Sequence, residues 1–302
     1  MSPSTTAAQD QALALIVARQ ADPATACAYL GTEAEGVRAE LDDLDVPWRE
    51  SLRVGLRDGR VVAAVLVDHD EETGRSWVHG PWAADEQAWD EHAEALLDAA
   101  VAQTPEGVDD HEVCAAPAHT LLAALAADRG WHRGVVNIAY VARSDAGWPQ
   151  PSSGTGATTR TTTVEDLPAL AELHDYAFPG TYATARQLLD DEDRTTVVLE
   201  RDGAVVGYAS AEVQADGEGY LDFIAVAEAV RGQGLARTLL ARIGREVLQA
   251  SPRGSVNLTV REDNLPAVAL YESFGFVRDA ELVGYRSRPY AHRTPAGPTA
   301  AE

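Results

Sequence analysis

The sequence has 302 residues, which is enough for two domains of ordinary size. Its 48 acidic and 24 basic residues give a formal net charge of −24, which argues against a broad nucleic-acid-binding surface. No apolar run approaches the ~20 residues that a membrane-spanning helix needs, and the first residues lack the basic start of a secretory signal. We therefore expect a cytoplasmic protein without nucleic-acid or membrane partners.

Other compositional features narrow the possible classes further. The two cysteines, Cys27 and Cys114, lack the paired spacing of a zinc site or a disulfide framework, so we expect packed thiols and no metal. The negative charge either favours a cationic substrate or serves solubility alone. A monomer or a homodimer is compatible with the sequence.

The first half of the chain predicts an alternation of strands and helices. A helix is expected near residues 13–29, followed by a hairpin that turns at Asp58 and Gly59. Then come a strand at 75–83, a helix at 88–103, a strand at 111–117, a helix at 120–130 and a strand at 135–143.

Between the halves, residues 144–156 read SDAGWPQPSSGTG, where Pro, Gly and Ser interrupt the apolar periodicity. We therefore predict a first domain at residues 1–145, a linker at 146–157 and a second domain at 158–288. The last residues, 289–302, are rich in Pro, Ala, Gly and Thr and are predicted to form a flexible tail.

The second half begins with a predicted strand near residues 158–163 and a helix at 163–178, with Thr163 as its N-cap. A second helix and two strands around a turn at Asp202 and Gly203 come next, followed by a strand at 219–226. The remaining elements are a helix with apolar positions Leu235, Leu239, Leu240 and Ile243, a strand at 255–260, a helix at 265–275 and a final strand around Val283.

The order hairpin, strand, helix, strand, helix, strand occurs in both halves, which indicates an internal duplication. Gly130 corresponds to Gly275 at a separation of 145 residues, and Leu96 corresponds to Leu239 at a separation of 143. The two separations agree within the variation expected of loops.

The segment FIAVAEAVRGQGLARTLLARI leads from an apolar strand through a glycine-rich loop into a helix. Glycines let the backbone approach a ligand closely, and the N–H groups and dipole of a helix N-terminus favour an anion such as a pyrophosphate. Arg231 and Arg237 add positive charge. Taken alone, such a loop also occurs in ordinary tight turns and in several nucleotide-binding folds.

A second segment, VREDNLPAVALYESFGF, makes the interpretation specific. Arg231-x-x-Gly234-x-Ala236, followed by Asn264, Tyr271 and Gly275-Phe276, resembles the two motifs of the GNAT superfamily of acyl-coenzyme A-dependent N-acetyltransferases. The resemblance covers residues 158–288 and implies an α/β (α+β mixed) fold of two tandem GNAT-like domains, each with a mixed central sheet flanked by helices. It also implies acetyl-coenzyme A as the co-substrate.

The resemblance assigns binding roles to particular residues. In such proteins the loop N–H groups hold the pyrophosphate, the preceding strand pairs with the pantetheine arm, and an asparagine on the later helix contacts the pantetheine side. The implied cofactor-binding residues are Ile224, Ala225, Val226, Arg231, Gly232, Gln233, Gly234, Leu235, Ala236, Arg237, Asn264 and Ala267.

The same resemblance makes Tyr271 the acid that protonates the leaving thiolate; the alternative is a core aromatic residue. Because the attacking amine must be neutral, a carboxylate base is also expected. Asp222 is the first candidate, since an unpaired carboxylate in an apolar strand is costly; the alternative is an ion pair. Glu212 is the second and Glu262 the third, and Thr259 stands where some family members carry a glutamate.

The acceptor site is harder to assign. In this family the segment after the first helix lies over the acceptor, and here it contains His174, Tyr176, Phe178 and Tyr182. Aromatic and acidic side chains in this segment suit a cationic amine. The alternative is the ordinary packing of a helix end.

The first half lacks both motifs. The separation of 143 residues puts Ala88 at the place of the loop arginine and Glu91 at that of the second loop glycine, where its carboxylate would repel a pyrophosphate. The separation of 145 puts His119 and Ala126 at the places of the asparagine and the tyrosine. We therefore predict a degenerate GNAT-like domain that packs on the active one and closes its acceptor cleft, an architecture that resembles the mycothiol synthase family.

The sequence thus predicts transfer of an acetyl group from acetyl-coenzyme A to the amine of a small molecule by direct attack. One alternative is an enzyme that acetylates the amine of a protein or peptide. A second alternative, from another class, is a non-catalytic coenzyme A-binding sensor.

Overall fold

The computed structural model describes residues 5–145, 147–148 and 156–290. The first half contains helices α1 (Thr5–Gln20), α2 (Ala34–Asp42), α3 (Trp48–Ser51), α4 (Glu86–Val101) and α5 (Thr120–Asp128), and strands β1 (Arg53–Arg57), β2 (Arg60–Asp70), β3 (Arg75–Ala83), β4 (Asp110–Ala115), β5 (His132–Arg133) and β6 (Asn137–Ala142). The second half contains β7 (Ala157–Thr161), η1 (Val164–Asp166), α6 (Leu167–Ala177), α7 (Gln187–Asp190), β8 (Arg194–Arg201), β9 (Ala204–Val213), β10 (Gly219–Val226), η2 (Glu228–Val230), α8 (Leu235–Ala250), β11 (Val256–Arg261), α9 (Leu265–Glu272) and β12 (Val277–Arg286). The order predicted for the second half is confirmed.

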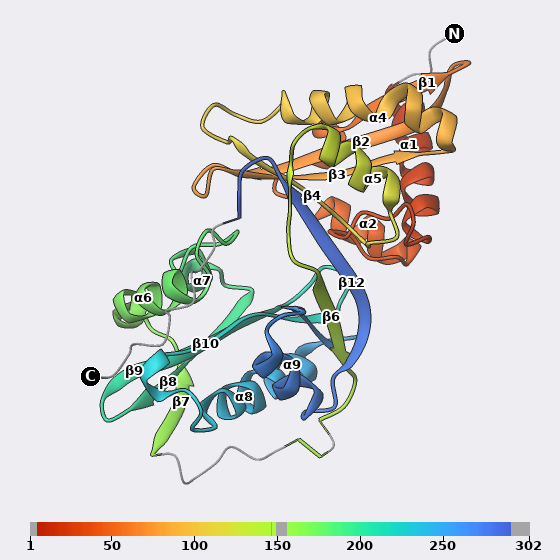
Figure 1. Ribbon diagram of the computed structural model, residues 1–302. Helices are drawn as coiled ribbons and strands as arrows, with labels where there is room; N and C mark the ends of the chain where they lie inside the picture. Colours follow the sequence, from red (N-terminus) through yellow and green to blue (C-terminus); the bar gives the residue numbers. More distant parts are fainter. Residues whose placement is uncertain (1–4, 146, 149–155, 291–302) are drawn as a thin grey trace.

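The strands form one mixed sheet in the order β1-β2-β3-β4-β12-β6-β11-β10-β9-β8-β7, with β5 beside β12. The β3–β4 and β10–β11 pairs are parallel. Helices cover both faces of each half, so that four apolar clusters flank the sheet (Figure 1). The predicted mixed α/β class is confirmed, although the two halves share a continuous sheet.

Two strands cross between the halves. Strand β6, which falls within the predicted first domain, lies between β11 and β12 in the sheet of the second half. Residues 277–282 of β12 pair with β6, and residues 283–286 continue as the neighbour of β4 in the first half. The long arrow of β12 in Figure 1 shows this crossing. The predicted boundary at residue 145 therefore divides the chain but not the sheet.

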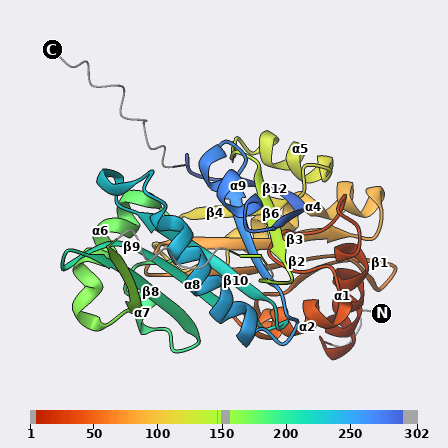
Figure 2. The ribbon, with the colours of Figure 1, turned by 90° about the horizontal axis from the view of Figure 1, so that it is seen from below.

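Helix α8 packs on the sheet with the face that the sequence predicts. Leu235, Leu239, Leu240 and Ile243 are all buried in the cluster beneath it. Figure 2 shows α8 lying across the strands of the second half. Its position brings its N-terminus to the end of β10, where the glycine-rich loop joins the two.

The helix predicted near residues 13–29 is wrong at both ends. Helix α1 ends at Gln20, because Pro23 disfavours a helical conformation at the residue before it. The short helices α2 and α3 were not predicted. Most of the predicted linker, residues 149–155, and residues 291–302 of the predicted tail lie outside the described residues.

The hairpin turns support the internal duplication. Asp58 and Gly59 have φ angles of 51° and 76°, and Asp202 and Gly203 have φ angles of 51° and 78°. Both turns therefore use the left-handed conformations that Asp and Gly tolerate in tight hairpins. They lie 144 residues apart, within the range that the two sequence separations span.

Sharing of strands predicts that the second half does not fold without β6. A fragment of residues 146–302 keeps both motifs but loses Ile138, Tyr140 and Ala142 from its core. We expect it to show no cooperative urea unfolding by circular dichroism, whereas a fragment of residues 130–302, which keeps β6, does. A cooperative transition in the shorter fragment would contradict the shared-strand interpretation.

Candidate active site

The glycine-rich loop has the conformation of an anion-binding turn. Gly232 and Gly234 both have φ of 76°, and Gly234 is the N-cap of α8. A Cβ atom built on either glycine would meet no atom within 4 Å. The left-handed backbone, and not a lack of space, therefore favours glycine at these two positions.

The backbone N–H groups of residues 232–236 have no acceptor within the described residues; the next donor, the N–H of Arg237, bonds to the carbonyl of Gly234 at 3.1 Å. These donors lie at the positive end of the α8 dipole. The Arg231 guanidinium donates to the carbonyl of Val226 at 3.0 Å, and that of Arg237 donates to Ser273 at 2.8 Å. The loop is thus electropositive in a strongly acidic chain.

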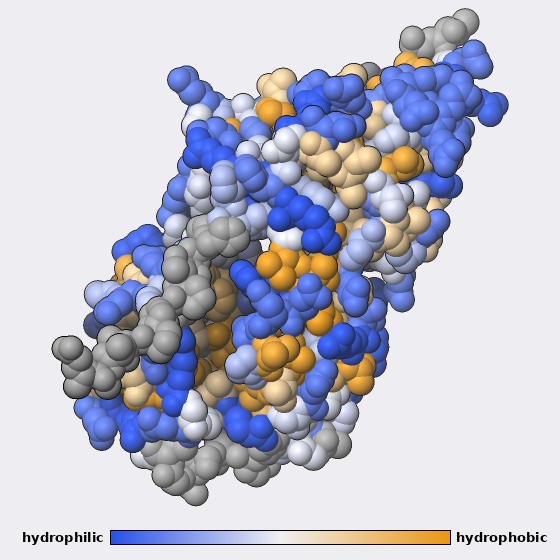
Figure 3. Space-filling view, viewed as in Figure 1, coloured by the Kyte–Doolittle hydropathy of each residue, from blue (hydrophilic) through white to orange (hydrophobic). Residues whose placement is uncertain are grey.

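Beside this loop the sheet is split. Strand β10 pairs with β11 only over residues 219–221, whereas it pairs with β9 along its whole length. The register shift between Leu221 and Phe223 makes Asp222 a bulge at the point of separation. Residues 224–226 therefore have an edge without a strand partner in the described structure. Figure 3 shows a hollow with apolar side chains over β10, between the α6–α7 side and α9.

Helix α9 borders the split. Asn264 is its N-cap and accepts from the N–H of Ala267 at 3.4 Å. Tyr271 is 5% exposed and packs edge-on against Phe276. Burial and the neighbouring Tyr220 raise the pKa of the Tyr271 phenol, so it is protonated at neutral pH. Its hydroxyl makes no hydrogen bond to the residues that the structure describes, which leaves its proton available.

The two candidate bases share one arginine. The Arg194 guanidinium contacts Asp222 and donates to Glu212 at 2.6 Å. The other Asp222 oxygen accepts from the Tyr182 hydroxyl, and the Asp222 side chain is only 1% exposed. Burial raises the pKa of Asp222. Asp222 thus has the ion pair that the sequence left open as the alternative. Its partner, Arg194, lies on another strand, and no motif in the sequence singles it out.

Glu212 is more accessible than Asp222. Its side chain is 27% exposed, and within the described residues only Oε2 accepts a hydrogen bond. Burial raises the pKa of Glu212, although Arg194 opposes the shift. Glu262 is exposed in the turn after β11, and Thr259 accepts from the Tyr220 hydroxyl at 3.0 Å.

The predicted acceptor residues fall into two groups. His174 is buried, and its ring nitrogens lie 2.5 Å from the Tyr208 hydroxyl and 2.8 Å from the Ala183 carbonyl oxygen. Burial lowers the pKa of His174. Phe178 is partly buried and packs against the same cluster, so the positions of both residues agree with ordinary packing of a helix end.

Tyr176 and Tyr182 are exposed near the split. The Tyr176 hydroxyl contacts Glu228 next to the glycine-rich loop, and the ring lies under the Arg231 guanidinium. Tyr182 reaches Asp222. These two side chains are therefore within reach of a molecule bound beside β10.

The first half lacks the glycine-rich loop. However, the separation of 143 residues, which placed Glu91 at the position of Gly234, does not hold in the structure. Helix α4 begins at Glu86, so Glu91 lies inside the helix and not at the position of Gly234. Instead, the carboxylate of Asp85 caps α4 by accepting from the N–H of Ala88 at 2.7 Å. His119 caps α5, as Asn264 caps α9.

The split between β3 and β4 in the first half is filled by the chain itself. Pairing of these strands ends at Glu112, and Cys27 then forms an antiparallel bridge with Ala115 on the vacated edge of β4. The N–H of Ala28 donates to the carbonyl of Cys114 at 2.8 Å. Both thiols are free, and burial raises the pKa of Cys27 to about 11.

Comparisons with known proteins agree with this geometry. Residues 162–276 match the model of the acetyltransferase (GNAT) family. Mycothiol acetyltransferase from Thermomonospora curvata is 39% identical over 92 residues, which are 30% of this chain and 31% of that protein. The match thus spans less than a third of that relative.

Two solved structures resemble nearly the whole chain. A GCN5-related N-acetyltransferase from Sphaerobacter thermophilus superimposes with a TM-score of 0.69 at 20% identity, over 95% of each chain. A tandem GNAT protein from the clavulanic acid biosynthesis pathway gives a TM-score of 0.60 at 19% identity, over 93% of this chain and 96% of that one. At these identities the likeness concerns the fold.

Residues 162–276, in the C-terminal half of the chain, thus carry a domain of the acetyltransferase (GNAT) family. Over 93% of the chain, the fold is similar to that of a tandem GNAT protein. In the described ranges, no cluster of His, Cys, Asp and Glu could hold a metal ion. No described helix combines the length and apolar character needed to cross a bilayer.

The filled split depends on Gln20, which is fully buried. Its amide nitrogen donates to the carbonyls of Cys27, Leu30 and Gly31, and its oxygen accepts from the N–H of Cys27 and from Trp82. Gln20→Leu leaves these groups unpaired, so we expect the free energy of unfolding to fall by about 3 kcal/mol or more. Urea denaturation would measure this, with the exposed Gln87→Leu as the control; equal effects would contradict it.

Proposed function

We propose that the C-terminal half transfers the acetyl group of acetyl-coenzyme A to the amine of a small molecule by direct attack. The observation that carries the proposal is that the unpaired amide groups of residues 232–236 adjoin the open edge of β10. A ligand with a pyrophosphate at one end and an amide-bearing arm at the other matches both features.

The binding roles follow from the positions of the residues. The N–H groups of Gly232, Gln233, Gly234, Leu235 and Ala236 take the pyrophosphate, with charge from Arg231 and Arg237. The edge of residues 224–226 pairs with the amides of the pantetheine arm, and Asn264 and Ala267 border its other side. These positions would direct the thioester toward the bulge at Asp222.

The side chains then supply the proton transfers. A carboxylate takes the first proton from the ammonium form of the acceptor, and the neutral amine attacks the thioester carbonyl. As the intermediate collapses, the C–S bond breaks and Tyr271 gives its proton to the departing thiolate, while the second proton of the amine nitrogen leaves and restores the Tyr271 phenol. We assign the base to Glu212, acting directly or through water, because one of its oxygens lacks a partner among the described residues. Asp222, with both oxygens engaged, orients Tyr182 and Arg194.

The charges near the split favour a cationic acceptor. The carboxylates of Asp191, Glu212 and Asp222 surround the single guanidinium of Arg194. A protonated amine that approaches them would be attracted before it loses its proton. One relative is named mycothiol acetyltransferase. For the present chain we propose a small-molecule amine as the acceptor and do not propose a particular compound. We expect this activity in the cytoplasm, with residues 1–145 as a degenerate companion domain.

Coenzyme A binding tests the loop. Asn and Asp both tolerate the left-handed conformation of Gly234 and differ mainly in charge. We expect Gly234→Asp to weaken acetyl-coenzyme A binding at least about tenfold more than Gly234→Asn, because its carboxylate caps the helix and repels the phosphates.

Calorimetry on the wild type should give one site per chain. Two sites would show that the first half also binds, and no binding would remove the proposed function.

The pH dependence tests the base. A general base works only when deprotonated, so kcat/KM should fall as the pH drops through the raised pKa of Glu212. Glu212→Gln should lower kcat/KM at neutral pH by about a hundredfold and abolish this acidic limb, with unchanged coenzyme A affinity. If Asp222→Asn abolishes the limb and Glu212→Gln keeps it, Asp222 is the base instead.

A further inference from the structure

The loop between α6 and α7 lies against the hairpin of β2 and β3 from the first half. The side chain of Gln187 donates to Asp70 at 2.6 Å, and the hydroxyl of Thr184 donates to Glu72 at 3.0 Å. These contacts hold the end of the loop that leads into α7. The catalytic half thus relies on the other half for the conformation of a segment that borders its split strand.

The middle of the loop is held by Arg75 and Trp77 of β3. The Arg75 guanidinium donates to the carbonyl of Gly180 at 3.3 Å. The Trp77 ring meets the Tyr182 ring edge-on, with centroids 6.5 Å apart. The Arg75 guanidinium also lies over the Trp77 ring, 5.5 Å from its centroid, so the two side chains stabilise each other's position.

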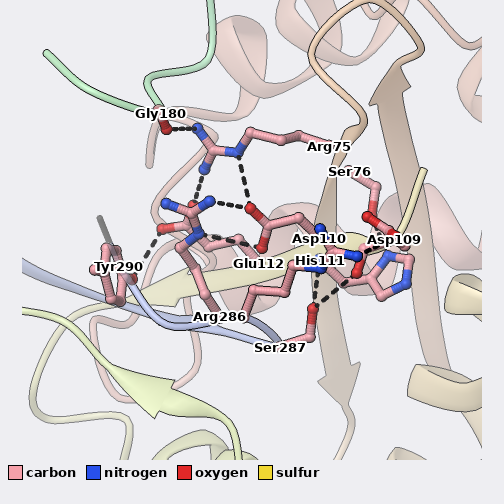
Figure 4. Close-up of polar contacts among 11 residues, drawn as sticks. Arg75, Ser76, Asp109, Asp110, His111, Glu112, Gly180, Arg286, Ser287 and Tyr290 are labelled. Atoms are coloured by element: carbon pink, nitrogen blue, oxygen red, sulfur yellow. Dashed lines mark hydrogen bonds and ion pairs between the residues drawn. The ribbon is translucent and has the colours of Figure 1, made fainter. Parts of the chain in front are cut away.

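Arg75 is fixed by a buried cluster of charges at the junction of the halves (Figure 4). Its guanidinium donates to Glu112 at 2.5 Å and lies 3.9 Å from Asp110. Arg286 of β12 pairs with Asp110, and Tyr290 donates to Glu112 at 3.3 Å. Burying these charges costs desolvation energy, and apolar side chains of similar size would stabilise the junction to an equal degree. What the cluster provides is a fixed direction for the Arg75 side chain.

The α6–α7 loop connects Arg75 and Trp77 to the acyl-transfer site. Tyr182 contacts Trp77 through its ring and Asp222 through its hydroxyl. Asp222 in turn contacts Arg194, which pairs with Glu212. A displacement of Tyr182 would therefore free one Asp222 oxygen and shift the guanidinium that holds the proposed base.

We propose that Arg75 and Trp77 are positioning residues for the acyl-transfer site, on which they act through the α6–α7 loop and Tyr182. This inference rests on the function proposed above. The first half, which lacks the coenzyme A motifs, thereby keeps the acceptor side of the second half in its working geometry.

The test uses the full-length chain and truncation of Trp77. Trp77→Ala should lower kcat/KM for the amine by about tenfold or more, since small displacements at a reacting centre are expensive. The acetyl-coenzyme A affinity should stay within about twofold, because the glycine-rich loop contacts neither residue. Trp77→Phe keeps an aromatic edge and should restore most of the activity. Trp131→Ala, which truncates a half-buried tryptophan in another cluster of the same half, is the control.

A second measurement does not depend on turnover. Hydrogen exchange of residues 178–187 should be faster in Trp77→Ala than in the wild type, and unchanged in Trp131→Ala. If the wild type turns over no amine, the proposed function fails, and faster exchange confined to this loop still supports the positioning contact. Wild-type kinetics or wild-type loop exchange in Trp77→Ala would overturn the inference. Loss of coenzyme A binding in Trp77→Ala, or an equal kinetic defect in Trp131→Ala, would overturn it too, because the effect would be global.

Discussion

Strands β10 and β11 run parallel, pair over residues 219–221 and then separate, and the chemistry of the second half depends on that separation. On that side, residues 224–226 have no strand partner among the described residues, and only the Val226 carbonyl is bonded there, by Arg231. The other backbone groups on this edge need a partner. The bulge at Asp222 lies where the strands part, and α8 begins where β10 ends. In the proposed function, the open edge of β10, the glycine-rich loop and the bulge at Asp222 bind the pantetheine arm, the pyrophosphate and the reacting thioester in turn.

The first half has the same arrangement of two parallel strands that separate, but there the gap between the strands is filled. Strands β3 and β4 also pair over three residues before they separate, but residues 26–28 occupy the vacated edge and Gln20 fixes them there. The carboxylate of Asp85 takes the place at the helix N-terminus that an anion would need. The predicted absence of coenzyme A binding in this half would thus have two structural causes, a filled split and a capped helix.

What the sequence predicted well depends on local rules. The turns at Asp58-Gly59 and Asp202-Gly203, the loop glycines and the buried side of α8 each follow from backbone preferences or helical periodicity. The end of α1 was misjudged because apolar residues continue past Pro23, and they belong to the segment that fills the split. The place of β6 and the role of Arg194 depend on which strands become neighbours, and that information is not contained in any single segment.

The position of β12 also affects when the first half can complete its sheet during translation. The edge of β4 at Ala115 receives its neighbour only when Val283 has left the ribosome, 168 residues later. At ordinary rates of translation this delay is on the order of ten seconds. During that time the nascent first half exposes a strand edge that is open to wrong pairing. The β4 edge that β12 covers in the finished structure is therefore the one left unpaired while residues 116–282 are made.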